Sequence, residues 1–305
     1  MATFPKSQPV SDLFHHHFHA AAEILSAKIE KPLRKEVEPE VLKLPEDGGY
    51  EFRPALPFRL EGIISYESGY TQVAGHQSPK AGQAFRTLTT SVVEGLNILD
   101  VITADRVVGQ ISTEHPVFPE GQVPSVTFLG TRFDNLRIAG HKVDIEPCLD
   151  IIGPKPSGDK SYFEDSGVFR RISGQYKNIN GVKGLPMWAS QQYRWSKAAA
   201  FQDKSKPGLN TANCSLVSSV EGAPGISFGH VIDLPNFGRI FLAELRVNRK
   251  QAQNHASQAG PQQHDTYSFH LTMIRMELGC IAHGSGHVIA LDSNGTGSGG
   301  GGHHP

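Results

Sequence analysis

"TLTTSVVEGLNILDVITADRVVGQIST", residues 87–113, is the most strand-like stretch of the chain. Thr, Val and Ile, which favour β-strands, recur throughout it, and Gly95, Asp100 and Gly109 interrupt them as turn residues do. A second stretch, "SVTFLGTRFDNLRIAGHKVDI" at 125–145, has the same texture. Short strands with frequent turns predict an antiparallel β-sandwich or a barrel-like domain, with a β-solenoid as the alternative.

The strand texture resumes at about residue 215, so we predict one β domain over residues 58–292. Loop-forming residues and both tryptophans lie at 153–210, which we interpret as an insertion with a short helix. Residues 1–57 form an N-terminal region outside this predicted domain. Residues 293–305, "SNGTGSGGGGHHP", have the composition of a flexible tail.

The N-terminal region contains "LFHHHFHAAAEIL" at 13–25, followed by further strong helix formers. Phe14, Phe18 and Leu25 recur at helical spacing, which predicts an amphipathic helix over 12–36 that Pro32 breaks or kinks. The proline-rich connector that follows is expected to be irregular. Because the connector would leave the helix loosely attached, we expect its apolar stripe to dock on a neighbouring subunit and to drive self-association.

The charge and the hydrophobic pattern of the chain argue against nucleic acid as a partner and against a membrane-spanning segment. The chain has 305 residues and a formal net charge of -1, so no overall positive field favours nucleic acid. Charged residues make up 19%, below the share of about 25% that is typical of soluble domains. No apolar run reaches the roughly 18 residues of a membrane span, and the first residues do not resemble an export signal.

Three cysteines, Cys148, Cys214 and Cys280, are spaced too widely for a CxxC motif. We predict buried, unreactive thiols, with one disulfide and one free thiol as the alternative. The chain also lacks the GxGxxG and P-loop patterns of nucleotide-binding sites. No cofactor is therefore predicted, apart from the histidine-bound metal considered next.

Two groups of side chains are candidates for binding a divalent transition metal. On the predicted helix, His15, His19 and Glu23 follow one another at intervals of four residues, which would place them on one flank. In the last β stretch, His270, His283 and His287 would meet if neighbouring strands brought them together. For both groups the alternative is an ordinary solvated or structural histidine.

Aromatic residues in the insertion are candidates for contact with a ligand or a partner. "MWASQQYRWSK" sets Trp188, Tyr193 and Trp195 beside basic residues. Exposed rings of this kind stack on sugars or on partner chains, whereas buried rings would anchor the insertion to the β domain.

Four segments occur in a familiar order: "GLNILDVITADRV", "VTFLGTRFDNLRIAGHKV", "DLPNFGRIFLAE" and "SFHLTM". In this order they resemble the domains of bacterial choice-of-anchor surface proteins, over roughly residues 58–291 without the insertion. The resemblance implies a secreted or cell-surface β domain and supplies no catalytic residues. The chain departs from that pattern because it shows neither a signal peptide nor a terminal anchor motif, so a cytoplasmic location is the alternative.

Taken together, these features predict a non-catalytic structural or interaction protein of the β class that associates with itself. One alternative is a metal-dependent enzyme that uses the histidines of the β domain. The other is a carbohydrate-binding module that uses the aromatic insertion to bind a glycan.

Overall fold

The strand-rich stretch at 87–113 forms the central hairpin of a sheet, made of β8 (Phe85–Ile98) and β9 (Ile102–His115). Leu99 and Asp100 at its turn both have a positive φ of 53°. The Asn97 side chain stabilises this turn, because its amide donates to Asp100 Oδ1 at 2.7 Å and its oxygen accepts from the Asp100 N–H at 2.9 Å.

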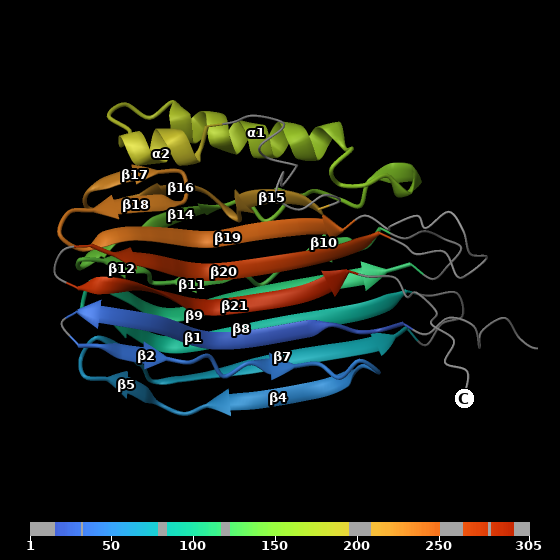
Figure 1. Ribbon diagram of the computed structural model, residues 1–305, viewed down its shortest axis with the longest axis horizontal. Coiled ribbons are helices and arrows are strands. Elements are labelled where there is room, and N and C mark those ends of the chain that lie inside the picture. The colour runs from blue at the N-terminus through green and yellow to red at the C-terminus, as the bar shows by residue number, and fades with distance from the viewer. Residues whose placement is uncertain are drawn as a thin grey trace, which may run out of the picture.

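The structure, a computed structural model, describes residues 16–31, 33–78, 84–116, 123–194, 209–250, 265–279 and 282–295. Two antiparallel sheets, A and B, lie face to face in it (Figure 1). The predicted antiparallel sandwich is therefore confirmed in outline. The sheets do not close on themselves, and their antiparallel pairing excludes the solenoid alternative.

In the described part of the chain, sheet A has nine strands. Its order is β17 (Ile226–Phe228), β18 (Val231–Leu234), β19 (Gly238–Lys250), β20 (Thr266–Leu278), β21 (His283–Gly295), β1 (Ala20–Lys31) and β2 (Lys35–Val37). β15 (Leu209–Ser215) also pairs with β19, and β3 (Leu42–Lys43) pairs with β1.

Sheet B has ten strands in the same described ranges. Its order is β13 (His141–Lys142), β12 (Arg137–Ile138), β9, β8, β6 (Ile64–Tyr66) and β5 (Phe58–Leu60). β10 (Ser125–Thr127) and β11 (Arg132–Asp134) pair with β9, while β7 (Ser68–Gln77) pairs with β8 and with β4 (Gly49–Ala55). A separate pair joins β14 (Asp144–Pro147) to β16 (Val217–Glu221).

The core lies between the sheets, where β21 and β1 pack on β7, β8 and β9. Gly109 in β9 lies where side chains of sheet A pack directly on sheet B. A Cβ at this position would lie 2.8 Å from Ile289 Cγ2 and 3.1 Å from both Leu291 Cδ1 and Met273 Cγ. Glycine is therefore favoured here, because even one methyl group would require these side chains to shift.

The predicted N-terminal helix is wrong for the residues that the structure describes. Residues 20–31 form β1, which lies between β21 and β2 in sheet A. Phe18 and Leu25, predicted to lie on an exposed docking stripe, are buried in the core of their own chain. Pairing with β21 along nearly the whole strand outweighs the helix propensity of "AAAEIL", because propensity is a weak preference that tertiary contacts override. Phe14 and His15 lie outside the described residues.

The connector predicted to be irregular contains β3 and β4, so residues 20–55 supply strands to both sheets. The insertion contains the 3-10 helix Ser157–Asp159 and two α-helices, α1 (Ser166–Asn180) and α2 (Met187–Gln192). Asp165 caps α1, because its side chain accepts from the Val168 N–H at 2.8 Å. Neither α-helix in the described ranges is long and apolar enough to cross a membrane. The predicted C-terminal tail lies largely outside those ranges.

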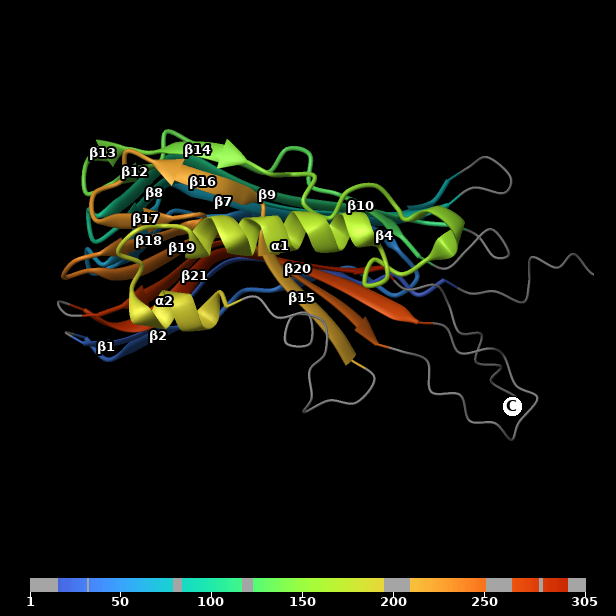
Figure 2. The same ribbon diagram turned by 90° about the horizontal axis from the view of Figure 1, so that it is seen from above.

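α1 closes one open side of the sandwich. Seen from above, it runs along the gap between the two sheets (Figure 2). Val168 and Ile172 on its buried face join the main core. Gln175 fixes it to sheet A, since its amide donates to the carbonyls of Ser215 at 3.0 Å and Val217 at 3.1 Å, and its oxygen accepts from the Ser215 N–H. The opposite open side is formed by β2, β4 and β5, at the bottom of Figure 1.

Candidate functional site

A cleft of about 370 Å³ lies on the open side opposite α1, between the edges of the two sheets. This volume is within the range of pockets that bind small molecules or single side chains of a partner. Sheet A and the residues after β2 line one wall, and β4, β5, β6 and β7 line the other. The lining residues are Ile24, Leu25, Val37, Glu38, Glu40, Arg53, Pro54, Ala55, Leu56, Pro57, Phe58, Tyr66 and Thr71.

The cleft has an apolar floor and an aromatic wall. Ile24, Leu25 and Thr71 are buried at its floor. Phe58 and Tyr66, both half-buried, stack with ring centroids 5.6 Å apart. Burial raises the pKa of Tyr66, and the negative charge of Glu40 raises it further, which places that carboxylate close to the phenol.

Charged side chains stand at the rim of the cleft. Glu38 and Glu40 project from the wall of sheet A, and Arg53 projects from the wall of sheet B; all three are exposed. Within the described ranges, none of these three charges takes part in an ion pair. The rim therefore has one more negative than positive charge, and all three are available to a ligand.

A row of exposed apolar side chains lies along β4, on the face opposite to that of Arg53 and Thr71. Tyr50, Phe52, Pro54 and Leu56 alternate along the strand and its end, and the exposed fractions of the three large side chains are 61% for Tyr50, 48% for Phe52 and 79% for Leu56. Pro54 and Leu56 also line the cleft. Exposed apolar side chains that cluster in this way mark binding surfaces more often than isolated ones do.

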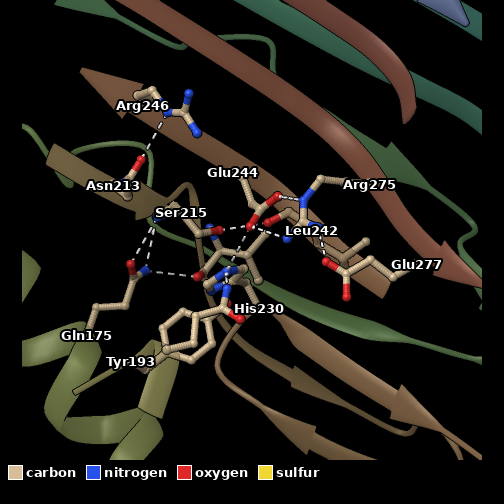
Figure 3. A network of polar contacts seen from close by, with 12 residues as sticks. Gln175, Tyr193, Asn213, Ser215, His230, Leu242, Glu244, Arg246, Arg275 and Glu277 are labelled. Atoms are coloured by element: carbon tan, nitrogen blue, oxygen red, sulfur yellow. Dashed lines mark hydrogen bonds and ion pairs between the residues drawn. The ribbon is translucent and has the colours of Figure 1, made fainter. Parts of the chain in front are cut away.

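A second group of polar residues covers the outer face of sheet A beneath α2 (Figure 3). Glu244 in β19 accepts two hydrogen bonds from the Arg275 guanidinium, at 2.5 and 3.0 Å, and Arg275 also donates to Glu277 at 2.6 Å. Ala243, whose φ is 47°, interrupts the alternation of β19. As a result Phe241 and Glu244 lie on the same face, where Arg275 stacks over the Phe241 ring at 3.6 Å.

His230 joins this network to the insertion. Its Nε2 lies 3.3 Å from Tyr193 Oη and 4.0 Å from Glu244 Oε1. Burial lowers the pKa of His230 to about 4, although the nearby Glu244 opposes the shift. Burial also raises the pKa of Tyr193. Both side chains are therefore neutral near pH 7 and enclosed by the protein, which suits a structural contact that holds α2 to the sheet.

The three histidines predicted to form a metal site in the β domain lie apart. His283 and His287 are on β21, and His270 on β20 is paired with Asp292 in register. Along a strand, four residues span about 13 Å, so His283 and His287 cannot bind one ion, and His270 lies about 17 Å beyond His287. No group of three or more metal-binding side chains gathers anywhere in the described ranges.

Each of two predicted histidines has a carboxylate partner instead. His287 Nε2 contacts Glu23 Oε1 across β1 and β21. His270 Nδ1 lies 2.8 Å from Asp292 Oδ1, while its Nε2 lies 3.3 Å from Thr272 Oγ1. Thr272, His270 and Asp292 thus follow the order of a nucleophile, a base and an orienting acid. They stand on the outer face of sheet A, whereas the cleft lies at another side of the molecule.

The predicted metal site on the N-terminal helix has lost its geometric basis. Glu23 lies in a strand, where residues four apart are separated by about 13 Å, and not on one helical flank. His19 is exposed just before β1.

The aromatic residues of the insertion pack against the sheet. Tyr193 is buried, and Trp188 contacts Phe228 with ring centroids 5.6 Å apart. The Trp188 Nε1–H donates to Asp233 at 3.1 Å, and Arg239 stacks over its ring at 3.7 Å. These two rings are engaged within the protein, which favours the anchoring interpretation over a glycan platform. Trp195 lies outside the described residues.

Cys148 and Cys214 are free thiols. Burial raises the pKa of both, which makes them poor nucleophiles. Cys214 is buried as predicted, whereas Cys148 is only half-buried. Cys280 lies outside the described residues.

Apart from Leu25, which was predicted to contact a partner for another reason, sequence reasoning missed the cleft residues, although a signal was present. In "GYEFRPALPF" at 49–58, apolar and charged residues alternate with the period of a strand, and "EVEPE" at 36–40 alternates carboxylates with other residues. The prolines of both segments favoured an irregular connector. Pro54 is compatible with β4 because β4 is an edge strand, where a missing N–H is tolerated.

Comparison with curated proteins and with solved structures gave no match. The resemblance to choice-of-anchor surface proteins accordingly stays a prediction. One family model, described as "Domain of unknown function (DUF8256)", matches residues 16–248. The match runs from the segment before β1 almost to the end of β19, and so covers more than half of the chain and most residues that line the cleft and the polar network. The chain belongs to this family, the domain of unknown function DUF8256.

Proposed function

We propose that this protein is a non-catalytic interaction protein that binds its partner at the cleft on the open side of the sandwich. The cleft itself carries the proposal, since it combines a buried apolar floor, an aromatic wall and three rim charges that are free of ion pairs within the described ranges. Most pockets that bind ligands share this combination of an apolar lining and a few polar groups.

The chemistry of the other polar groups supports binding over catalysis. Glu244, Arg275 and Glu277 bind one another, and His230 and Tyr193 are enclosed beneath α2. The Thr272, His270 and Asp292 set stands on the outer face of sheet A, where the His270 and Asp292 side chains are 38% and 46% exposed and water competes for the hydrogen bond between them. Acyl transfer relies on hydrogen-bond donors that stabilise an oxyanion in a site that excludes water. The outer face of sheet A is open to water at His270 and Asp292, so we favour the cleft over this face as the functional site.

One part of the proposal, the location of the protein, rests on sequence alone. The surface or extracellular location follows from the resemblance to choice-of-anchor proteins. Self-association was predicted from an apolar helical stripe, and it loses that support because Phe18 and Leu25 lie in the core of their own chain.

Binding of the neutral apolar dye Nile red to the full chain tests the proposal. We expect saturable binding of one dye per chain, and we expect Ala55→Trp, which fills the cleft, to abolish it. Leu56→Asp, at a residue that is 79% exposed, should weaken binding without disturbing the fold. Leu129→Ser is the matched control, because Leu129 is also exposed but lies outside the cleft.

Dye binding that is equal in all of these variants would contradict the cleft as the site. The non-catalytic part has its own test in the hydrolysis of p-nitrophenyl acetate. Activity that disappears in His270→Ala and in Thr272→Ala would refute it.

A further inference from the structure

We infer that His16 and His115 together bind one Zn²⁺ ion. Neither histidine lines the cleft, so this inference goes beyond the proposed function and does not depend on it. Three features of the described residues carry it: the ring nitrogens of His115, which have no partner, the spacing of the two rings, and the packing that fixes both rings.

His115 is a buried side chain whose polar atoms are unused. The side chain is 1% exposed, and neither Nδ1 nor Nε2 has a hydrogen-bond partner among the described residues. Buried polar groups in folded proteins nearly always have a partner, and a bound ion or water is a common explanation of an exception. Both nitrogens of His115 can therefore accept a ligand.

The His16 ring lies at the distance that a shared ion requires. The centroids of the two rings are 5.3 Å apart, and the ring planes are inclined by 51°. Two imidazoles that bind one tetrahedral Zn²⁺ at about 2.1 Å have ring centroids about 5 Å apart. An ion between the rings would take one nitrogen from each, and water would complete its coordination.

Packing against other rings fixes both side chains. His16 is buried and stacks on Phe85, with ring centroids 4.2 Å apart and an angle of 3° between the planes. Phe85 lies opposite His115 in the register of β8 and β9, so the three rings meet at the open end of this hairpin. His16 precedes β1 of sheet A, and His115 ends β9 of sheet B, so the ion would tie the two sheets together.

The chemistry of the rings selects a transition metal. Burial lowers the pKa of His115 to about 3, so the ring is neutral near pH 7, and the neutral imidazole is the form that binds a metal. Imidazole suits Zn²⁺, whereas Ca²⁺ and Mg²⁺ prefer oxygen ligands. Lys155 makes a smaller contribution to the same pKa shift, so its positive charge acts on the site and should weaken the binding of a cation.

Thermal unfolding of the full chain near pH 7, in EDTA and in roughly 100 µM Zn²⁺, tests the inference. Zinc should raise the Tm by about 2–4 °C, because an ion that binds only the folded chain stabilises it. The histidine run at 15–19 does not obscure this effect. Histidines adjacent in sequence also bind zinc in the unfolded chain, and such binding adds little net stability.

His16→Phe and His115→Phe each keep an aromatic ring and remove one ligand, so each should abolish the zinc effect. His17→Asn with His19→Asn is the matched control, because these two residues belong to the same run but are exposed. The control should keep the full rise in Tm. In Lys155→Met, the zinc concentration that gives half of the rise should fall about threefold, since a repelling charge has been removed.

Co²⁺ in place of Zn²⁺ reports the coordination, because four-coordinate Co²⁺ absorbs visible light strongly and six-coordinate Co²⁺ weakly. We expect a strong band that is lost in His115→Phe. A Tm that zinc does not raise, or a rise that survives His115→Phe, overturns the inference and leaves two rings that only pack. A rise that disappears in the His17→Asn with His19→Asn variant places the ion on the exposed run and also overturns it. Nile red binding should be equal with and without zinc, so neither result affects the proposed function.

Discussion

Two of the buried histidines, His115 and His230, make the stability of the protein sensitive to acid. Neither ring nitrogen of His115 has a hydrogen-bond partner among the described residues, and the His16 ring lies 5.3 Å away. Burial, with smaller contributions from His16 and Lys155, lowers the pKa of His115 from 6.5 to about 3. His230, whose pKa is about 4, is the second such group. Both histidines are neutral in the folded protein and become charged on unfolding in mild acid.

Stability should therefore fall as the pH drops below about 6.5. Each histidine takes up a proton more readily in the unfolded chain, so at pH 5 the unfolded state is favoured by about 2 kcal/mol per histidine relative to pH 8. Urea denaturation at the two pH values measures this loss. His115→Phe keeps an aromatic ring and should remove about half of the pH-dependent loss. The matched control His76→Phe, at an exposed position, should retain all of it; a loss of equal size in His115→Phe would contradict the assignment.

Among single elements, β1 differs most from the sequence-based prediction, because a strand stands where a helix was expected. As a strand between β21 and β2, it presents Ala20, Ala22 and other small residues to the core between the sheets. Phe18, just before it, lies against Gly48 and Gly75. A Cβ at Gly75 would come within 2.6 Å of the Phe18 ring, so the aromatic ring and the two glycines fit one another.

Phe18→Ala separates the two interpretations of this segment. A core phenylalanine replaced by alanine should lower the free energy of unfolding by about 3–5 kcal/mol and leave the molecular mass in solution unchanged. Phe52→Ala, at an exposed aromatic residue, is the matched control and should change stability by no more than about 0.5 kcal/mol. Denaturation curves and light scattering measure both quantities. A Phe18→Ala protein of unchanged stability but altered molecular mass in solution would instead support the prediction that Phe18 docks on a neighbouring subunit.

The strands were easier to predict than the helices. The hairpin of β8 and β9 can be predicted because its β-branched residues indicate strands and its turn residues lie where the strands end. α1, in contrast, contains Gly167, Gly174 and several β-branched or polar residues, which are poor helix formers. Its helix is stabilised by the Asp165 cap and by Gln175, whose partners lie about 40 residues away in sequence, and no local pattern reveals such partners.

The candidate site could be predicted only in part, for the same reason. Cross-strand register brings Glu23 to His287 and His270 to Asp292, and it separates histidines that are close in sequence. The cleft depends on the approach of two sheet edges, one from residues 24–40 and the other from residues 53–71. Sequence spacing identified the charged and aromatic residue types but not which of them meet.

At the scale of the whole molecule, the two open sides of the sandwich differ. α1 fills the gap on one side with its own apolar face (Figure 2). On the other side, the edges of β2, β4 and β5 leave the cleft, and the exposed Leu56 lines it. The central claim is that the partner of this protein binds in the cleft on this second side.

Hydrogen–deuterium exchange of the full chain, with and without Nile red, tests that claim most directly. We predict slower exchange on binding in residues 36–40 and 49–58, which border the cleft, and unchanged exchange in residues 166–192, which form α1 and α2. Protection confined to residues 166–192 or to the outer face of sheet A, with none at the cleft, would contradict the account.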